Sequence, residues 1–374
     1  MLVERLRRSR LFAKRGNPLL KPLDRAGIPI VWLLGLLPSR RMPAQPRRIG
    51  FLRTAAVGDT LLLSGVLRDV RAAYPEADLV LFTGRENAQA GSLSVARIGR
   101  LVVLPLSRPH AAIAALRRER LDVLVDTGAW PRFDAFLAAL SGARYRVGFR
   151  TARQYRHYAY DASVHHDSNV HEIENFRALG RAIGTTAATI PSIACDGLPH
   201  IPETPRRPFV VFHPWAGGYR GEIREWPEER WIELARRLAP NFESFLITGA
   251  PSQAGRTAKL VDRLHAHGLR AAGSTHTVRD VASILAQSDL VVGVNTSIPH
   301  LGALLGVPAV VLDGPTGPMR WGLIGPKVAS VTSVLPGCGF LDLGFEYAGH
   351  RTDCMQGISV DAVHEAARNL LHLA

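Results

Sequence analysis

Short apolar runs and amphipathic stretches alternate along most of this 374-residue chain. Each apolar run predicts a buried strand, and the stretch after it, with apolar residues at helical spacing, predicts a helix. Leu290 to Thr316 is the clearest case, because an apolar strand (290–294) leads into a short helix that Gly306 and Pro308 end, and a second strand (309–312) follows. Repeated units of this kind predict parallel sheets covered by helices on both faces, which is the α/β class.

The same pattern gives the other elements and the domains. Further strands are predicted at 49–53, 79–82, 101–104, 121–125, 145–149, 209–212 and 244–248, and helices at 60–74, 111–118, 133–140, 254–267, 360–371 and from Pro227. Proline is dense in residues 196–208, which therefore separate two runs of strands and helices. We predict domains at 48–200 and 208–374 behind an extension, 1–47, with the last helix in the second domain or packed back on the first.

The net charge of +14 is concentrated at one end of the chain. Residues 1–48 hold twelve Lys or Arg against Glu4 and Asp24, a net charge of +10, so the remainder carries only +4. A nearly neutral body argues against a nucleic-acid partner, and the basic segment instead predicts a cationic appendage.

Within this appendage, the apolar run Ile28 to Leu37 is flanked by Arg25 and by Arg40 and Arg41. The run is too short to span a bilayer, and no small-residue cleavage site of a signal peptide follows it. We favour an interfacial segment in which Trp32 and the leucines enter an anionic membrane surface and the arginines contact lipid headgroups. The alternative is a segment that packs on the body or on a second chain.

Cysteine and histidine add little chemistry of their own. Three cysteines, Cys195, Cys338 and Cys354, are too few and too scattered for a disulfide framework or a four-ligand zinc site, which fits a reducing compartment. Cys338 and Cys354 could pair, but we favour free thiols. Residues 150–171 are rich in Arg, Tyr and His; the adjacent His165 and His166 lack ligand spacing, so we predict a solvated polar loop over an anionic or sugar-bearing substrate rather than a metal site.

Two loops that follow predicted strands are candidates for binding and catalysis. Gly58 and Asp59 lie between the strand 49–53 and its helix, where Asp59 is either a plain N-cap or a general base exposed to a substrate hydroxyl. After the strand 290–294, Ser297 can cap the helix, Pro299 is tolerated in its first turn, and free amides with His300 favour a phosphate. The alternative for this second loop is a capped helix with a surface histidine.

Three segments in this order resemble the ADP-heptose:lipopolysaccharide heptosyltransferases, glycosyltransferase family 9. Residues 48–75 contain the strand, Val-Gly-Asp and amphipathic helix of that family's N-terminal signature. Residues 212–226 resemble its His-Pro-Gly-Ala segment followed by Lys-x-Trp-Pro, with Arg224 in the lysine position. Residues 293–314 resemble its Asp-Thr-Gly-x-x-His segment with the following Gly-x-Pro and Phe-Gly-Pro-Thr, and Cys354-Met355 also fits the family pattern.

The resemblance implies a GT-B fold, with two Rossmann-like domains facing a cleft, the acceptor on the first and the nucleotide-sugar on the second. It implies an inverting transfer of a heptose or similar sugar from an ADP-sugar to a lipopolysaccharide core or lipid A acceptor, with Asp59 as catalytic base. No Asp-x-Asp occurs in the chain, which suits transfer without a metal or other cofactor. Implied donor-binding residues are Arg224, Asn295, Thr296, Ser297, His300, Gly217 and Gln253, and acceptor-binding candidates are Gly58, Asp126 and Arg132.

The chain departs from the family pattern at three of these positions. Asn295 stands for Asp, Ser297 stands for Gly, and Gln253 lies near a position often occupied by Glu. These departures leave two alternatives open: a non-catalytic relative that binds nucleotide-sugar or lipopolysaccharide, and a nucleotide-sugar epimerase on the same fold. The basic extension favours the transferase, because it would hold the enzyme at the cytoplasmic face of the inner membrane, near a phosphate-rich acceptor.

Overall fold

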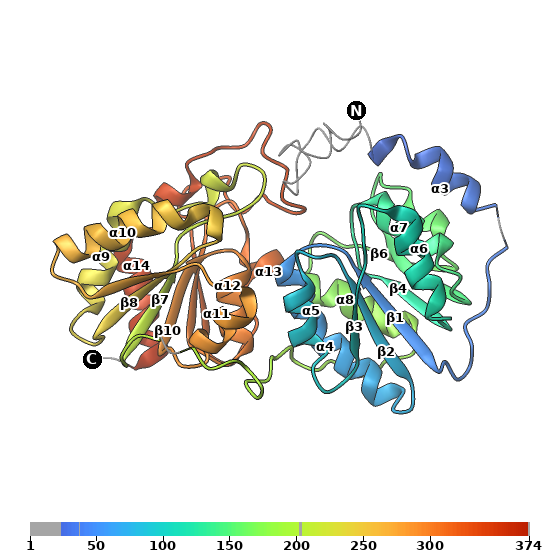
Figure 1. Ribbon diagram of the computed structural model, residues 1–374. Coiled ribbons are helices and arrows are strands. Elements are labelled where there is room, and N and C mark those ends of the chain that lie inside the picture. Colours follow the sequence, from blue (N-terminus) through green and yellow to red (C-terminus); the bar gives the residue numbers. More distant parts are fainter. Residues whose placement is uncertain (1–23, 37, 202–203, 373–374) are drawn as a thin grey trace, which may run out of the picture. The chain divides into compact units, whose positions relative to one another are not determined.

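The computed structural model describes residues 24–36, 38–201 and 204–372. The described residues form two compact units that divide between Pro191 and Ser192, earlier in the chain than the predicted end of the first domain (Figure 1). Each unit is built around one parallel sheet with helices on both faces, which confirms the α/β class.

The strands of the first unit pair in the order β3-β2-β1-β4-β5-β6. Their bounds are β1 (Arg48–Arg53), β2 (Asp78–Thr83), β3 (Arg100–Val103), β4 (Val123–Asp126), β5 (Tyr145–Arg150) and β6 (Ala162–His165). One group of contacting helices comprises α4 (Val57–Ala73), α5 (Ala88–Ser94) and α8 (Glu172–Ala182), and another comprises α3 (Ile28–Leu34), α6 (Pro109–Arg118) and α7 (Arg132–Leu140); a short 3-10 helix, η1 (Arg156–Ala159), contacts α3 and α7.

The strands of the second unit pair in the order β12-β11-β10-β7-β8-β9. Their bounds are β7 (Phe209–His213), β8 (Ser244–Thr248), β9 (Ala271–Ser274), β10 (Leu290–Val294), β11 (Ala309–Asp313) and β12 (Val328–Thr332). The helices are α9 (Glu228–Leu238), α10 (Ala254–Ala266), α11 (Val278–Leu285), α12 (Ser297–Leu304), α13 (Pro318–Trp321) and α14 (Val360–Leu371), with 3-10 turns η2 (Gly221–Arg224), η3 (Pro251–Gln253) and η4 (Cys354–Gly357).

Both sheets have the strand order of a doubly wound Rossmann fold. In each, the chain starts at a central strand, builds outward to one edge, and then returns to build the other half on the opposite side. Loops therefore diverge between β1 and β4 in the first unit and between β7 and β10 in the second. In open α/β sheets, ligands bind at this switch point, outside the carboxyl ends of the strands.

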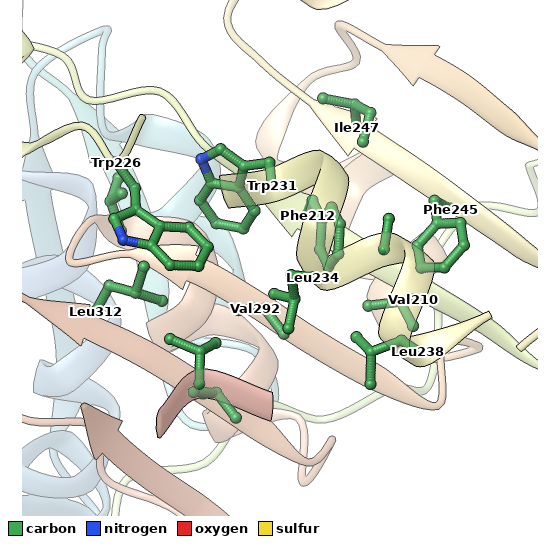
Figure 2. Close-up of a cluster of buried hydrophobic side chains, with 14 of the residues drawn as sticks. Val210, Phe212, Trp226, Trp231, Leu234, Leu238, Phe245, Ile247, Val292 and Leu312 are labelled. Atoms are coloured by element: carbon green, nitrogen blue, oxygen red, sulfur yellow. The ribbon is translucent and has the colours of Figure 1, made fainter. Parts of the chain in front are cut away.

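The core of the second unit is aromatic. Figure 2 shows Phe212 of β7 beside Trp231 of α9, and their ring centroids lie 5.1 Å apart. Trp226 meets Trp231 edge-on, and its indole nitrogen donates to the carbonyl of Ile358, just before α14. Helix α14 packs in this unit, because Val363 and Ala367 join the same buried cluster.

The apolar run of the appendage forms α3 in the first unit. Val31 is buried in the core there, so the alternative of packing on the body is correct for one face of the helix. Ile30, Trp32, Leu33 and Leu36 remain about half or more exposed. Within the described ranges, no helix is both long enough and apolar enough to cross a bilayer. The predicted basic segment before Asp24 lies outside the described residues.

Local sequence pattern missed several elements. Residues 150–171 are not a solvated loop throughout, because they contain η1 and β6, and His166 is buried with its Nε2 3.1 Å from a carboxylate oxygen of Glu172. His171 caps α8 by accepting from the amide of Ile173. The expectation of free thiols is wrong for one pair, since Cys338 and Cys354 form a disulfide that ties the loop after β12 to η4. Cys195 is free and exposed.

Candidate functional site

The predicted donor residues gather at the carboxyl edge of the second sheet. Strands β7 and β10 are paired there, with Gly293 opposite His213, so the loops that follow them are neighbours at the switch point. A side chain at Gly293 would clash with Pro299 and His213, and glycine therefore lets the first turn of α12 approach the end of β7. Burial lowers the pKa of His213 to about 4, so this imidazole is neutral at the edge.

Asn295 and His300 form a buried pair in the loop after β10. The Nδ2 of Asn295 donates to Asp313 Oδ1 at 2.5 Å and to the carbonyl of Trp321 at 2.9 Å. Its Oδ1 lies 3.3 Å from His300 Nε2. The prediction of a surface histidine is wrong, because His300 is only 6% exposed. The loop after β10 is therefore tied to the ends of β11 and α13.

Asp313 is the residue at this edge that sequence analysis missed. It ends β11, and its Oδ1 also accepts from the hydroxyl of Thr316 at 3.1 Å. Burial raises the pKa of Asp313 to about 6, against hydrogen bonds from Asn295, Thr316 and Ser330 that lower it. A signal was present, since Asp313 stands where the family pattern Phe-Gly-Pro-Thr has its aromatic residue.

Thr296 and Ser297 begin the helix that follows. The N-cap of α12 is Thr296 and not Ser297, which becomes the first helical residue. The Thr296 side chain donates to the carbonyl of Val294, so it does not cap the helix amides. Both residues are partly exposed at the N-terminus of α12. The first N–H groups of a helix and the helix dipole stabilise an anion at such a place.

Arg224 and Gly217 lie together in the loop after β7. The guanidinium of Arg224 donates to the carbonyl of Gly217, which holds the side chain across the glycine-containing turn. The loop between β12 and η4 supports this arrangement, because its Leu341 and Tyr347 pack on Ile223, next to Arg224. Gln253 lies one loop further along the sheet, after β8, and its Oε1 accepts from the amide of Ala250.

In the first unit, Asp59 lies at the carboxyl edge of β1. It is the third residue of α4, whose N-cap is Ala56 with a positive φ of 71°, so the interpretation of Asp59 as a plain N-cap is wrong. Its carboxylate forms an ion pair with Arg53, and the two side chains are 12% and 5% exposed. Arg53 also donates to the carbonyls of Ala55 and Thr127. Gly58 precedes Asp59 in the same helical turn.

The other two acceptor candidates are buried in structural contacts. Asp126 exposes none of its side chain, and its Oδ2 accepts from Arg156 at 2.5 Å and from the Tyr160 hydroxyl at 2.6 Å. Arg132 is 3% exposed and forms an ion pair with Asp24, just before α3. Both side chains thus organise the interior of the first unit, and neither presents a surface to an acceptor in this structure.

Asp134 joins the same interior network. Both of its carboxylate oxygens are within 2.9 Å of the Thr54 hydroxyl, which follows directly after β1. Burial and the charge of Asp126 raise the pKa of Asp134 to about 7. A protonatable carboxyl group therefore lies behind the loop that carries Asp59. Among the described residues, no group of three or more His, Cys, Asp or Glu side chains could hold a metal ion.

Comparisons with known proteins identify the family. Residues 110–338 match the model of glycosyltransferase family 9 (heptosyltransferase). Lipopolysaccharide heptosyltransferase 1 of Escherichia coli K12 is 26% identical over 297 residues, which cover 74% of this chain and 90% of that protein.

Solved structures share the fold. The E. coli ADP-heptose lipopolysaccharide heptosyltransferase II superimposes with a TM-score of 0.69 at 18% identity, over 87% of this chain and 98% of that one. The E. coli heptosyltransferase WaaC with ADP gives a TM-score of 0.68 at 21% identity, over 86% of this chain and 99% of that one. With two Rossmann-like units, the fold is of the GT-B type, and the chain belongs to glycosyltransferase family 9 and is a glycosyltransferase.

Proposed function

We propose that this enzyme transfers a heptose from ADP-heptose to a lipopolysaccharide core acceptor, with inversion at the anomeric carbon and without a metal ion. The observation that carries the proposal is that the candidate base and the candidate phosphate-binding groups each lie at the ligand-binding edge of a Rossmann-like sheet. The carboxylate of Asp59 lies at the switch-point edge of the first sheet, and the cationic and amide donors lie at that edge of the second. The relatives named above carry heptosyltransferase activity in their names.

The donor diphosphate is assigned to the second unit. Its negative charge would meet the guanidinium of Arg224 and the first amides of α12, at Thr296 and Ser297, with His300 behind them. Preorganised N–H donors stabilise the charge that develops on the leaving group, which is the role a divalent ion has in other transferases. Gly217 lets the backbone approach the ligand, and Gln253 is assigned to the nucleoside.

The acceptor hydroxyl is assigned to the first unit, beside Gly58 and Asp59. The Asp59 carboxylate takes the proton of this hydroxyl while the hydroxyl oxygen attacks the anomeric carbon. The bond from that carbon to the diphosphate oxygen breaks at the same time. ADP leaves on the opposite face with the electron pair of that bond, so the configuration inverts. Arg53 holds the base in place through the ion pair.

The basic extension would hold the enzyme against the cytoplasmic face of the inner membrane. Support comes from α3, where Ile30, Trp32, Leu33 and Leu36 remain exposed on a helix flanked by Arg25, Arg40 and Arg41. A peripheral membrane contact usually combines apolar side chains that enter the interface with cations that lie near anionic lipid.

Calorimetry with a panel of ADP-, UDP- and GDP-sugars tests the donor assignment. We expect one nucleotide class, ADP, to bind tightly, and Arg224→Ala and His300→Ala each to weaken that binding about tenfold or more, as loss of a charge-assisted contact does. The matched controls are Arg236→Ala and His265→Ala, on the exposed faces of α9 and α10. Failure of every nucleotide-sugar to bind wild type would favour the non-catalytic alternative.

A further inference from the structure

One carboxylate ties together three loops at the donor edge. Strands β10 and β11 pair in parallel with Val294 opposite Leu312, so the residues that follow, Asn295 and Asp313, come side by side. Asp313 accepts from the Asn295 amide and from the Thr316 hydroxyl, and Asn295 donates in addition to the carbonyl of Trp321. Asp313 and Asn295 therefore connect the loop after β10, the loop after β11 and the end of α13.

The orientation of the Asn295 amide follows from these partners. A carboxylate and a carbonyl accept but never donate, so the group that faces Asp313 and Trp321 must be the NH₂. The carbonyl oxygen then points toward His300, whose Nε2 lies 3.3 Å away. Because that oxygen can only accept, the imidazole must carry a hydrogen on Nε2 to bond with it.

The same geometry explains why position 295 is an amide. An aspartate there would set a second carboxylate against Asp313 and against the Trp321 carbonyl, with no hydrogen between three acceptors. All of this lies in the interior, since Asn295, His300 and Asp313 are 7%, 6% and 1% exposed, and water cannot relieve the conflict. The asparagine at 295, where the family pattern has aspartate, thus accompanies an acid at 313, where that pattern has an aromatic residue.

We infer that Asp313 is a positioning residue of the donor site: its carboxylate fixes the Asn295 amide, and that amide fixes the tautomer and direction of the His300 imidazole. The inference rests on the proposed function for the ligand, and on the hydrogen bonds that link Asp313, Asn295 and His300 for the arrangement of the three side chains. Its consequence is that a carboxylate at position 295 is tolerated better opposite an amide at position 313 than opposite Asp313.

A mutant cycle with Asn295→Asp, Asp313→Asn and the double variant tests the coupling. Asp313→Asn keeps an acceptor oxygen for Asn295 and should bind ADP-heptose within about threefold of wild type, whereas Asn295→Asp, with two facing carboxylates, should lose about tenfold or more. The double variant sets an amide donor at 313 against the new carboxylate at 295 and should recover part of that loss, because the carboxylate still faces the Trp321 carbonyl. A double variant that binds no better than Asn295→Asp would overturn the inference.

Nitrogen-15 NMR of the His300 ring tests the arrangement without a ligand. Wild type and the double variant should show the Nε2–H tautomer, because an acceptor at residue 295 faces that nitrogen in both. Asp313→Leu, which removes the acceptor for the Asn295 amide, should show a mixture of tautomers in a protein that keeps its native circular dichroism. A single Nε2–H tautomer in that variant would contradict the role of Asp313. If wild type fails to bind ADP-heptose but Asp313→Leu shows the mixture of tautomers, the donor assignment fails and the positioning role stands.

Discussion

Arg53→Met removes the partner of the proposed base while keeping an unbranched apolar stem in the interior. Arg53 is buried with the guanidinium on Asp59, and it also donates to the carbonyls of Thr127 at 2.6 Å and Ala55 at 2.9 Å. Its guanidinium lies 5.5 Å from the ring centroid of Phe176, so the charged group also contacts α8. The substitution therefore deletes one ion pair and two charge-assisted hydrogen bonds with little loss of volume.

The cost can be estimated from what remains behind. Removing one partner of a buried ion pair costs about 3 to 5 kcal/mol, because the other charge loses its compensation. Asp59→Asn in the same background removes that charge, so the double variant should be more stable than Arg53→Met by on the order of 1 to 2 kcal/mol. The exposed Arg48 on the same strand is the control, and Arg48→Met should cost about 0.5 kcal/mol or less.

Urea unfolding of wild type, Arg53→Met, Asp59→Asn and the double variant measures these free energies, with Arg48→Met as the control. Turnover of ADP-heptose with acceptor measures the effect on catalysis. We expect Arg53→Met to lower turnover as well as stability, because the carboxylate loses the contact that orients it. Additive losses, with the double variant less stable than wild type by the sum of the two single losses, would refute the claim that Arg53 and Asp59 act as one pair.

Three further predictions concern other parts of the chain. Asp134 has a pKa of about 7 in the folded protein against 3.8 in its ordinary state, so the folded state binds more protons between these pH values and stability must fall as pH rises through them. Asp134→Asn still accepts from Thr54, and at pH 8 it should raise the free energy of unfolding by on the order of 3 kcal/mol, with no gain at pH 3; an unchanged pH slope would contradict this. Cys338→Ser should lower the free energy of unfolding by about 3 kcal/mol relative to the oxidised protein, since a loop with a sequence separation of 16 is no longer closed, and equal stability of reduced and oxidised wild type would argue against the disulfide. Ile30→Ser with Leu33→Ser should weaken sedimentation with anionic vesicles and leave binding to neutral vesicles unchanged; undiminished sedimentation would exclude α3 as the membrane contact.

Strong local patterns gave most of the fold. Leu290 to Val294 and Ser244 to Thr248 were predicted with their observed bounds, because each is a short, mainly apolar run limited by polar or loop residues. Strands β9 and β12 carry short or weakly apolar sequences, Ala271–Ser274 and Val328–Thr332, and their pairing with β8 and β11 decides their structure. Such pairing is not visible in a local pattern.

In the candidate site, too, some residues were predicted from local sequence and others were not. Asp59 and His300 were found from the loops in which they occur, since a residue after a strand and before a helix is visible in the sequence. The contact between Asp134 and Thr54 was missed because the two residues lie 80 positions apart in the chain. The Arg53–Asp59 and Asp313–Asn295 contacts span only 6 and 18 positions, but a pattern of strands and helices does not give the direction of these side chains. Asp313 and Asn295 could have been linked, because both depart from one family pattern and both follow neighbouring strands.

Transfer itself is the most direct test of the proposed function. Purified enzyme is mixed with ADP-heptose and a lipopolysaccharide core acceptor that lacks heptose, and both ADP release and the mass of the acceptor are followed. We predict one heptose added for each ADP released, no transfer by Asp59→Asn, and unchanged transfer by Asp262→Asn, on the exposed face of α10. ADP release that does not depend on the acceptor, or an Asp59→Asn variant as active as wild type, would contradict the proposal.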